Sequence, residues 1–143
     1  MFRKSKAKAT HTRTISPMFG MLGLFGFTGF LGFMPNTFGF SGMFSAPFPF
    51  LFFAFFGFFG FYYEGKMSNT MIDERFLSNK YRAGAIANKT SWIIVIVVSV
   101  ISISILRIST YNLLSILIAT IGITFGLSAF LQQFLLYRFE TEE

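Results

Sequence analysis

The chain has 143 residues, of which 53% are hydrophobic and 13% charged, and it carries a formal net charge of +6 and no cysteine. Soluble domains carry about 25% charged residues, so this composition excludes an ordinary soluble domain and favours a membrane protein of one domain. The absence of cysteine excludes disulfides and thiolate metal sites. No nucleic-acid-binding motif accompanies the positive charge, so nucleic acid is not expected as a partner.

Residues 1–16 form a basic leader that we expect to be disordered in the cytoplasm. Its cations are Arg3, Lys4, Lys6, Lys8 and Arg13. No small-x-small cleavage site follows the next apolar run, which predicts an uncleaved first span rather than a secretory signal peptide. The absence of acids before Glu64 also fits a mitochondrial leader, although the leader lacks a clear apolar stripe.

Four apolar runs predict four transmembrane helices, at about 18–34, 47–63, 92–108 and 113–137. They belong to a transmembrane domain, residues 17–138, which is followed by an acidic tail, residues 139–143. All Lys and Arg residues except Arg107 would then lie on one side of the bilayer, and the positive-inside rule makes that side the cytoplasm. We therefore expect both termini in the cytoplasm, beside anionic lipid headgroups.

Glycine recurs at every third residue from Gly20 to Gly32, in the half of the chain that holds most of its 23 Phe residues. A step of three turns an α-helix by about −60°, so these glycines cannot form one packing stripe on an α-helix. A 3₁₀-helix would align them, but 3₁₀ runs beyond about 3–4 residues are uncommon. We therefore predict α-helices that approach closely at their glycines, with Phe rings filling the remaining space. The similar phrases Phe25–Phe30 and Phe56–Phe61 indicate either a tandem duplication or biased composition.

The polar stretch Glu64–Thr90 contains a predicted amphipathic cytoplasmic helix, at about 71–88. Thr70 and Asp73 have the spacing of a capping box, which opens a helix. The residues singled out at its start are Ile72, Asp73, Glu74, Arg75 and Phe76. Its apolar side is expected either on the membrane surface or under the helix bundle, and the helix either continues into the third span or breaks near residues 88–91. The predicted fold is thus an all-α membrane protein with four transmembrane helices and one amphipathic cytoplasmic helix.

Two motifs follow the paired Phe/Gly spans, Glu64-Gly65-Lys66-Met67-Ser68-Asn69 and Asp73-Glu74-Arg75-Phe76. In this order the parts resemble an uncharacterised family of small bacterial integral membrane proteins, catalogued as a domain of unknown function. That family has a Gly/Phe-rich helical hairpin, a Gly-Lys-Met step, an Asp-Glu-Arg helix start and two more apolar spans. The similarity covers about residues 18–137, and the basic leader lies outside it. It implies a bacterial cell membrane and, as one option, a gene paired with a small DNA-binding regulator, but no known activity.

The fourth apolar run contains the clearest packing motif of the chain. Gly122 and Gly126 form a GxxxG element, extended by Ser115 and Ala119 at similar spacing. Such stripes let helices approach closely, either inside one monomer or between two copies of a homo-oligomer. Three polar residues in or beside the spans are candidates for a polar contact, Arg107, Gln132 and Gln133. Arg107 either binds an anion or gates a pathway, or it extends its side chain to the outer headgroups.

The sequence lacks the groups that catalysis needs. His11, the only histidine, lies in the leader, and no acid lies inside a predicted span. We therefore expect no catalytic, cofactor-binding or metal site and no enzyme, and an ion-coupled transporter is disfavoured. The resulting hypothesis is a non-enzymatic small membrane protein that acts through protein interactions at the cytoplasmic face. The alternative is a pore-like or toxin-immunity membrane protein that affects permeability.

Overall fold

The computed structural model describes residues 10–34, 47–104 and 109–142. These residues form two 3₁₀-helices and three α-helices, in the order η1 (Pro17–Phe33), η2 (Phe48–Phe59), α1 (Gly60–Lys66), α2 (Glu74–Ser104) and α3 (Thr110–Glu142). The described part of the chain contains no strand, only a single bridge between His11 and Met71. It is therefore a helical protein, and α3 continues through all but the last residue of the predicted acidic tail.

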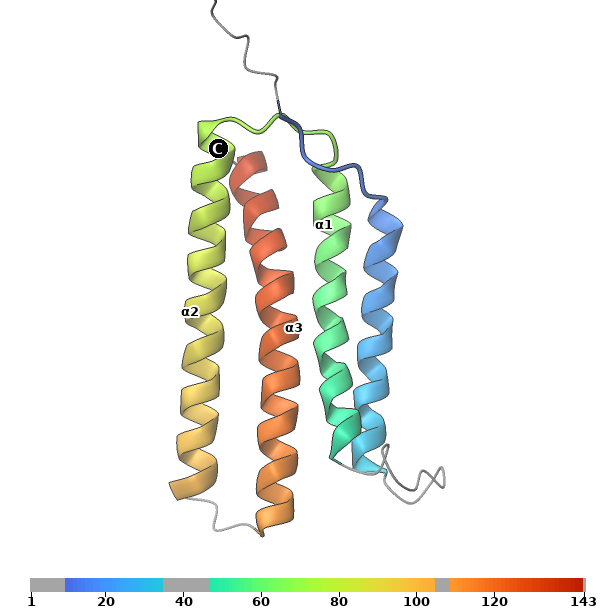
Figure 1. Cartoon of the computed structure of the whole chain (residues 1–143), viewed down its shortest axis with the longest axis vertical. Coiled ribbons are helices and arrows are strands. Elements are labelled where there is room, and N and C mark those ends of the chain that lie inside the picture. The colour runs from blue at the N-terminus through green and yellow to red at the C-terminus, as the bar shows by residue number, and fades with distance from the viewer. Residues whose placement is uncertain (1–9, 35–46, 105–108, 143) are drawn as a thin grey trace, which may run out of the picture.

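The elements lie side by side in one row, in the spatial order α2, α3, η2 with α1, and η1 (Figure 1). Contacts form only between neighbours in this row. The central helix α3 lies against α2 on one side and against η2 and α1 on the other, whereas η1 lies only against η2 and α1. The described helices therefore form an open row, and their interfaces are pairwise.

The prediction of α-helices in the first two apolar runs is wrong for η1 and η2, which wind as 3₁₀-helices. With three residues per turn, every third residue of such a helix lies on the same face. The buried residues of η1 form one glycine stripe: Gly20, Gly23, Gly26, Gly29 and Gly32. The residues that face this stripe form one aromatic ladder on η2 and α1: Phe50, Phe53, Phe56, Phe59 and Tyr62.

Each glycine of the stripe packs against one aromatic residue of the ladder, from Gly32 against Phe50 to Gly20 against Tyr62. A Cβ atom built on Gly29 would lie only 2.5 Å from Cδ1 of Phe53. Successive ring centroids of the four Phe residues are 6.2, 5.9 and 6.2 Å apart, which matches the rise of about 6 Å over three residues of a 3₁₀-helix. Since only glycine leaves room for these rings, their packing favours the uncommon winding over the α-helix.

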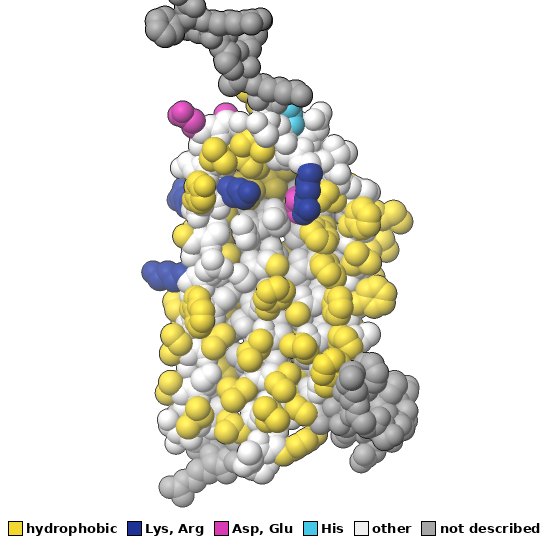
Figure 2. Space-filling view, in the orientation of Figure 1, with side chains coloured by type: hydrophobic (Ala, Val, Ile, Leu, Met, Phe, Trp, Pro, Cys, Tyr) yellow, Lys and Arg dark blue, Asp and Glu magenta, His cyan; other side chains and the backbone are white. Residues whose placement is uncertain are grey.

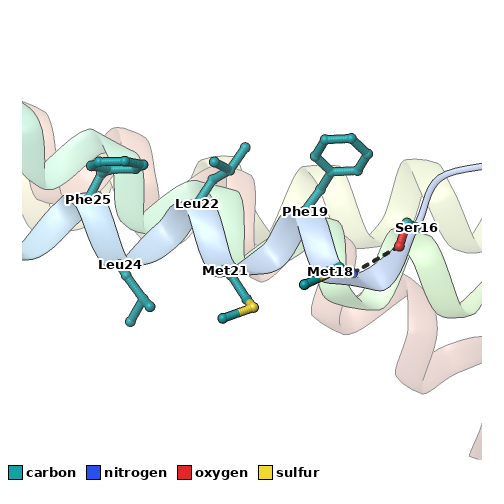
Figure 3. Close-up of a pocket in the computed structure, with 7 residues that line it drawn as sticks. All are labelled: Ser16, Met18, Phe19, Met21, Leu22, Leu24 and Phe25. Carbon is teal, nitrogen blue, oxygen red and sulfur yellow. Dashed lines mark hydrogen bonds between the residues drawn. The ribbon is translucent and has the colours of Figure 1, made fainter.

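The other two faces of η1 carry exposed apolar side chains. Figure 3 shows one ladder on each side of the helix, with Met18, Met21 and Leu24 opposite Phe19, Leu22 and Phe25. Met18 is 72% exposed and Phe25 is 58% exposed. A continuous apolar surface of this kind is unusual in water, because monomeric soluble proteins rarely expose large contiguous patches. It is what a helix in contact with lipid presents.

The 3₁₀ winding also lengthens the first apolar run. The 17 residues of η1 rise about 34 Å as a 3₁₀-helix but only about 25 Å as an α-helix. The hydrocarbon core of a bilayer is about 30 Å thick, so the observed winding has the length to cross it. Three longer helical stretches are both long and apolar enough to cross a membrane: Phe48–Lys66, Glu74–Ser104 and Thr110–Glu142.

Helix α2 is unbroken from Glu74 to Ser104, so the amphipathic helix and the third apolar run form one continuous element. Asp73 opens it, because its Oδ1 accepts a hydrogen bond of 2.7 Å from the backbone N–H of Phe76. The capping box predicted from Thr70 is therefore wrong, and Asp73 itself is the N-cap. Ser91, near the predicted break, donates its hydroxyl to the carbonyl oxygen of Thr124 on α3.

A small hydrophobic core lies where α2 begins and α3 ends. It consists of Met67, Phe76, Ala83 and Leu136, with Ile72 packed against it. Phe76 is 4% exposed and Ala83 is fully buried. The apolar side of the amphipathic helix was expected either on the membrane surface or under the helix bundle. In the structure it packs against the other helices.

Candidate functional site

One end of the row gathers most of the charged side chains seen in Figure 2, and we call it the polar end. It consists of residues 10–16, the turn 67–73, the first turns of α2 and the last turns of α3. The remaining height of the visible face is mainly apolar or backbone. The polar end is therefore the part of the described chain that can contact soluble or charged partners.

Residues 10–16, the described part of the leader, are held in place at the polar end, contrary to the disorder expected for them. The backbone N–H of Thr12 donates to the carbonyl oxygen of Thr70 at 2.8 Å, and the N–H of Ile72 donates to the carbonyl oxygen of Thr10 at 2.8 Å. Ser68 bonds the backbone of Ile15 twice, accepting from its N–H at 2.9 Å and donating to its oxygen at 2.7 Å. Residues 10–16 thus form an ordered segment beside the turn.

A charged pair joins the leader to α1. Arg13 donates from Nε to Oε1 of Glu64 at 2.7 Å and from Nη2 to Oε2 at 3.1 Å. The hydrogen bond and the carboxylate charge raise the pKa of Arg13 above its ordinary value. The Arg13 side chain is 66% exposed and that of Glu64 only 18%, so water screens the pair from one side. Its main consequence is geometric, because a two-point contact fixes both side chains.

Further polar contacts fix α2 against the end of α3. Asn79 is 6% exposed and donates from Nδ2 to Oε1 of Glu140 at 2.7 Å. The guanidinium of Arg82 lies 4.6 Å from the centre of the Phe139 ring, within the range of a cation–π contact. These contacts hold both helix ends in one orientation, so the surface that they expose is preformed.

A pocket of about 480 Å³ opens at the polar end, and we call it the polar-end pocket. The leader, α1, α2 and α3 all contribute to it. The polar side chains in its lining are His11, Thr12, Arg13, Glu64, Lys80, Gln132 and Gln133. Its apolar floor includes Phe76 and Leu136 of the small core. Cationic, amide and apolar groups therefore meet in one cavity.

A second pocket of about 420 Å³, the side pocket, lies between α3 and the helical stretch η2–α1. Its lining is mainly glycine, alanine and phenylalanine: Ala54, Phe55, Gly57, Phe58, Gly60, Phe61, Phe125 and Ala129. Four polar residues line both pockets: Arg13, Glu64, Gln132 and Gln133. The two cavities are therefore adjacent, and their shared wall is polar.

Gly122 and Gly126, the predicted packing residues of the fourth run, lie against the backbone of η2. A Cβ on Gly122 would lie 2.8 Å from the carbonyl oxygen of Phe50, and one on Gly126 would lie 2.8 Å from that of Phe53. Ala119 and Ser115 are half-buried farther along α3, and the Ser115 hydroxyl donates to the carbonyl oxygen of Tyr111, on its own helix. The GxxxG face thus packs inside the monomer.

The other residues singled out from the sequence lie in different parts of the structure. Gln132 and Gln133 line both pockets, whereas Arg107 lies outside the described residues. At the start of α2, Phe76 and Ile72 belong to the core region and Asp73 caps the helix, while Glu74 and Arg75 are exposed. Sequence reasoning missed the pairing of Arg13 with Glu64, because residues 51 positions apart carry no local signal of contact.

The described residues contain no group of three or more His, Asp or Glu side chains that could hold a metal ion. Comparisons of the chain with protein families, with curated proteins and with solved structures found no match. The resemblance to the small bacterial membrane proteins therefore stays a prediction. Fold and composition define the class: a helical protein with three stretches long and apolar enough to cross a membrane.

Proposed function

We propose that this chain crosses the membrane four times and acts without catalysis, by binding a protein partner at the cytoplasmic face. Four spans are supported by the three long apolar stretches together with η1, whose 3₁₀ rise brings it to the thickness of a bilayer. The described chain begins and ends at the polar end (Figure 1), which agrees with two termini on one side. The positive charge there favours the cytoplasm as that side, and the family resemblance supports a bacterial cell membrane.

The observation that carries the proposal is an exposed and preformed face of α2 at the polar end. Tyr81 is 75% exposed and Leu77, one turn earlier, is 41% exposed. The opposite face of the same turns is fixed by the buried Phe76, Asn79 and Ala83. An exposed aromatic side chain beside an apolar one, on a helix that cannot rotate, is typical of the anchor of a protein interface.

A non-enzymatic role is supported by the state of the ionisable side chains at the polar end. Glu64 is already paired with Arg13, and Glu140 accepts from Asn79. His11 is exposed on the leader. Neither of these two contacts joins a nucleophile to a base and an orienting partner, the arrangement that covalent catalysis uses.

The test is site-specific photo-crosslinking in intact cells. A photoreactive amino acid at Tyr81 should give one discrete protein adduct, and Leu77→Asp in the same chain should abolish it. The same photoreactive group at Phe27, which is 56% exposed on η1 away from the polar end, is the control and should give no adduct with another protein. An adduct pattern that is equal at the two positions, or insensitive to Leu77→Asp, would contradict the proposal.

The alternative, a pore-like or toxin-immunity protein, gains no specific support from the described row, whose helices contact only their neighbours. It makes a different prediction for purified protein in liposomes. A pore would release a trapped dye, whereas an interaction protein would leave the vesicles sealed.

A further inference from the structure

We propose that the polar-end pocket and the side pocket together bind one anionic phospholipid. Its phosphate lies between Lys80 and Arg13, and an acyl chain lies in the side pocket between η2 and α3. This site is separate from the exposed face at Tyr81, so either proposal can fail without the other.

The first support is the size and adjacency of the two cavities. Their volumes are about 480 and 420 Å³, and each alone lies within the range of about 300–1,000 Å³ typical of ligand pockets. Arg13, Glu64, Gln132 and Gln133 line both. The two pockets therefore lie on either side of these four side chains, and a ligand that occupies both would lie along them.

The second support is the separation of polar and apolar lining. Lys80, His11 and Thr12 line only the polar-end pocket, whereas Phe55, Phe58 and Ala129 line only the side pocket. A soluble anion would use the first cavity alone, and a purely apolar molecule would use the second. An amphiphile with a charged head and an apolar chain matches both.

The third support is the charge of the polar-end pocket. Glu64 is its single acid, and Arg13 offsets that charge through the two-point contact. Lys80 is exposed and forms no ion pair with any described residue. The guanidinium of Arg13 keeps further N–H groups for a ligand, since only Nε and Nη2 donate to Glu64. The pocket therefore carries net positive charge and favours an anionic headgroup over a zwitterionic one.

The fourth support is the position of the Gln133 side chain along η2–α1. The Gln133 side chain reaches Gly60, since a Cβ built on that glycine would lie 3.3 Å from Cγ of Gln133. Gly60 precedes the charged Glu64 by one helical turn and follows the apolar Phe58 and Phe59. The amide of Gln133 on α3 thus lies beside the boundary between the apolar and the charged residues of η2–α1. A lipid headgroup held beside Gln133 would place its acyl chain in the side pocket.

The experiment uses fluorescence quenching by brominated lipids in reconstituted vesicles. The variant Trp92→Phe with Phe58→Trp places the only indole in the side pocket, and the chain with its native Trp92, 67% exposed on α2, reports on bulk lipid. Both are placed in phosphatidylcholine vesicles that contain an equal fraction of brominated phosphatidylglycerol or brominated phosphatidylcholine. Phe61→Trp in the same background is a second reporter for the case in which Phe58→Trp does not fold.

At the side-pocket reporter, we expect the brominated anionic lipid to quench with an apparent affinity about fivefold higher than the zwitterionic lipid, the factor for one cation near an anionic headgroup. At Trp92 the two lipids should quench alike. Lys80→Gln should remove the preference, and Lys89→Gln, which makes the same charge change on the same helix outside both pockets, should retain it.

Three outcomes would overturn the proposal. One is equal quenching by the two lipids at the side-pocket reporters. Another is an equal loss of preference in the Lys80→Gln and Lys89→Gln variants, which would indicate only general attraction to the basic protein. The third is relief of quenching by soluble glycerol phosphate, which would show that the site takes a free phosphate rather than a lipid.

Discussion

The two halves of the row place helices against each other in different ways. In the η1–η2 half, whole Phe rings fill the space above glycines, and the helices are wound with three residues per turn. In the α2–α3 half, the helices are regular α-helices joined by polar contacts, among them Ser128 donating to Oδ1 of Asn88 at 3.1 Å. Both halves are long and apolar, so apolar character alone does not determine the helix type.

The spacing of small residues separates the two halves. The stripe of η1 repeats at three residues, as a 3₁₀-helix requires for alignment, whereas Ser115, Ala119, Gly122 and Gly126 of α3 alternate between four and three, as an α-helix requires. The two patterns meet where η2 packs on α3. Three residues of a 3₁₀-helix rise about 6.0 Å and one α-helical turn about 5.4 Å, so the two helix types stay nearly in step over a few turns.

The largest expected effect comes from Gly126→Leu, at the junction between the halves. A side chain there would meet the carbonyl oxygens of Phe53 and Ala54, which are backbone atoms and cannot rotate away. We expect a loss of about 3 kcal/mol or more in the free energy of unfolding, as for severe overpacking. The measurement is denaturation in detergent followed by helical circular dichroism.

Gly84→Leu is the matched control for that variant. A Cβ on Gly84 would find only the Gln132 side chain, at 3.6 Å, which is an ordinary contact. Leucine also has a higher helix propensity than glycine by nearly 1 kcal/mol, so this variant should be neutral or stabilising. Equal denaturation midpoints for the two variants would show that the halves are not in close backbone contact.

A smaller effect is expected inside the 3₁₀ half, from Gly29→Leu. The new side chain meets the Phe53 ring rather than backbone, so we expect a loss of about 2 kcal/mol. Phe53→Ala is itself destabilising because the ring is buried. Its loss should be smaller when Gly29→Leu is already present, with a coupling energy of about 1 kcal/mol or more between these two sites. The same unfolding measurement on the single and double variants gives this value.

The control for the register uses another ring of the ladder. Phe59 faces Gly23 rather than Gly29, so Gly29→Leu with Phe59→Ala should show additive losses. Equal coupling at both rings would mean that the glycine stripe does not pair with single rings and that the 3₁₀ register is incorrect.

The sequence predicted the helical class and the three long apolar stretches, because residues that must lie in lipid have to be apolar over a whole helix length. It also identified the period of three from Gly20 to Gly32. The sequence alone favours an α-helix there, because 3₁₀ runs beyond about 3–4 residues are uncommon. The Phe50–Phe59 ladder that faces these glycines lies on another segment. A long-range partner decided the helix type, and local propensity could not.

The candidate site was predicted less completely than the fold. Gln132, Gln133 and Phe76 were singled out by polarity or by helical periodicity, and these signals are local. The positions of Arg13, Glu64 and Lys80 around one pocket depend on where the leader lies, and a basic leader without an apolar stripe gives no such signal. The structure locates the leader through hydrogen bonds that the Thr12 and Ser68 hydroxyls donate to the backbone carbonyl oxygens of Met67 and Ile15.

The smallest expected effect is the loss of the capping side chain at the start of α2 or of η1, both of which begin at the polar end. Asp73 caps α2 through a hydrogen bond of 2.7 Å, whereas the Ser16 hydroxyl accepts from the N–H of Met18 at 3.4 Å, near the limit of such a bond. Asp73→Ala should therefore cost about 1 kcal/mol and speed amide hydrogen exchange at Phe76. Ser16→Ala should cost only a few tenths of that, because η1 is held by its glycine stripe rather than by its cap. A larger loss for Ser16→Ala would mean that the 3₁₀-helix depends on its first turn, and that the rings of the aromatic ladder are not what maintains its winding.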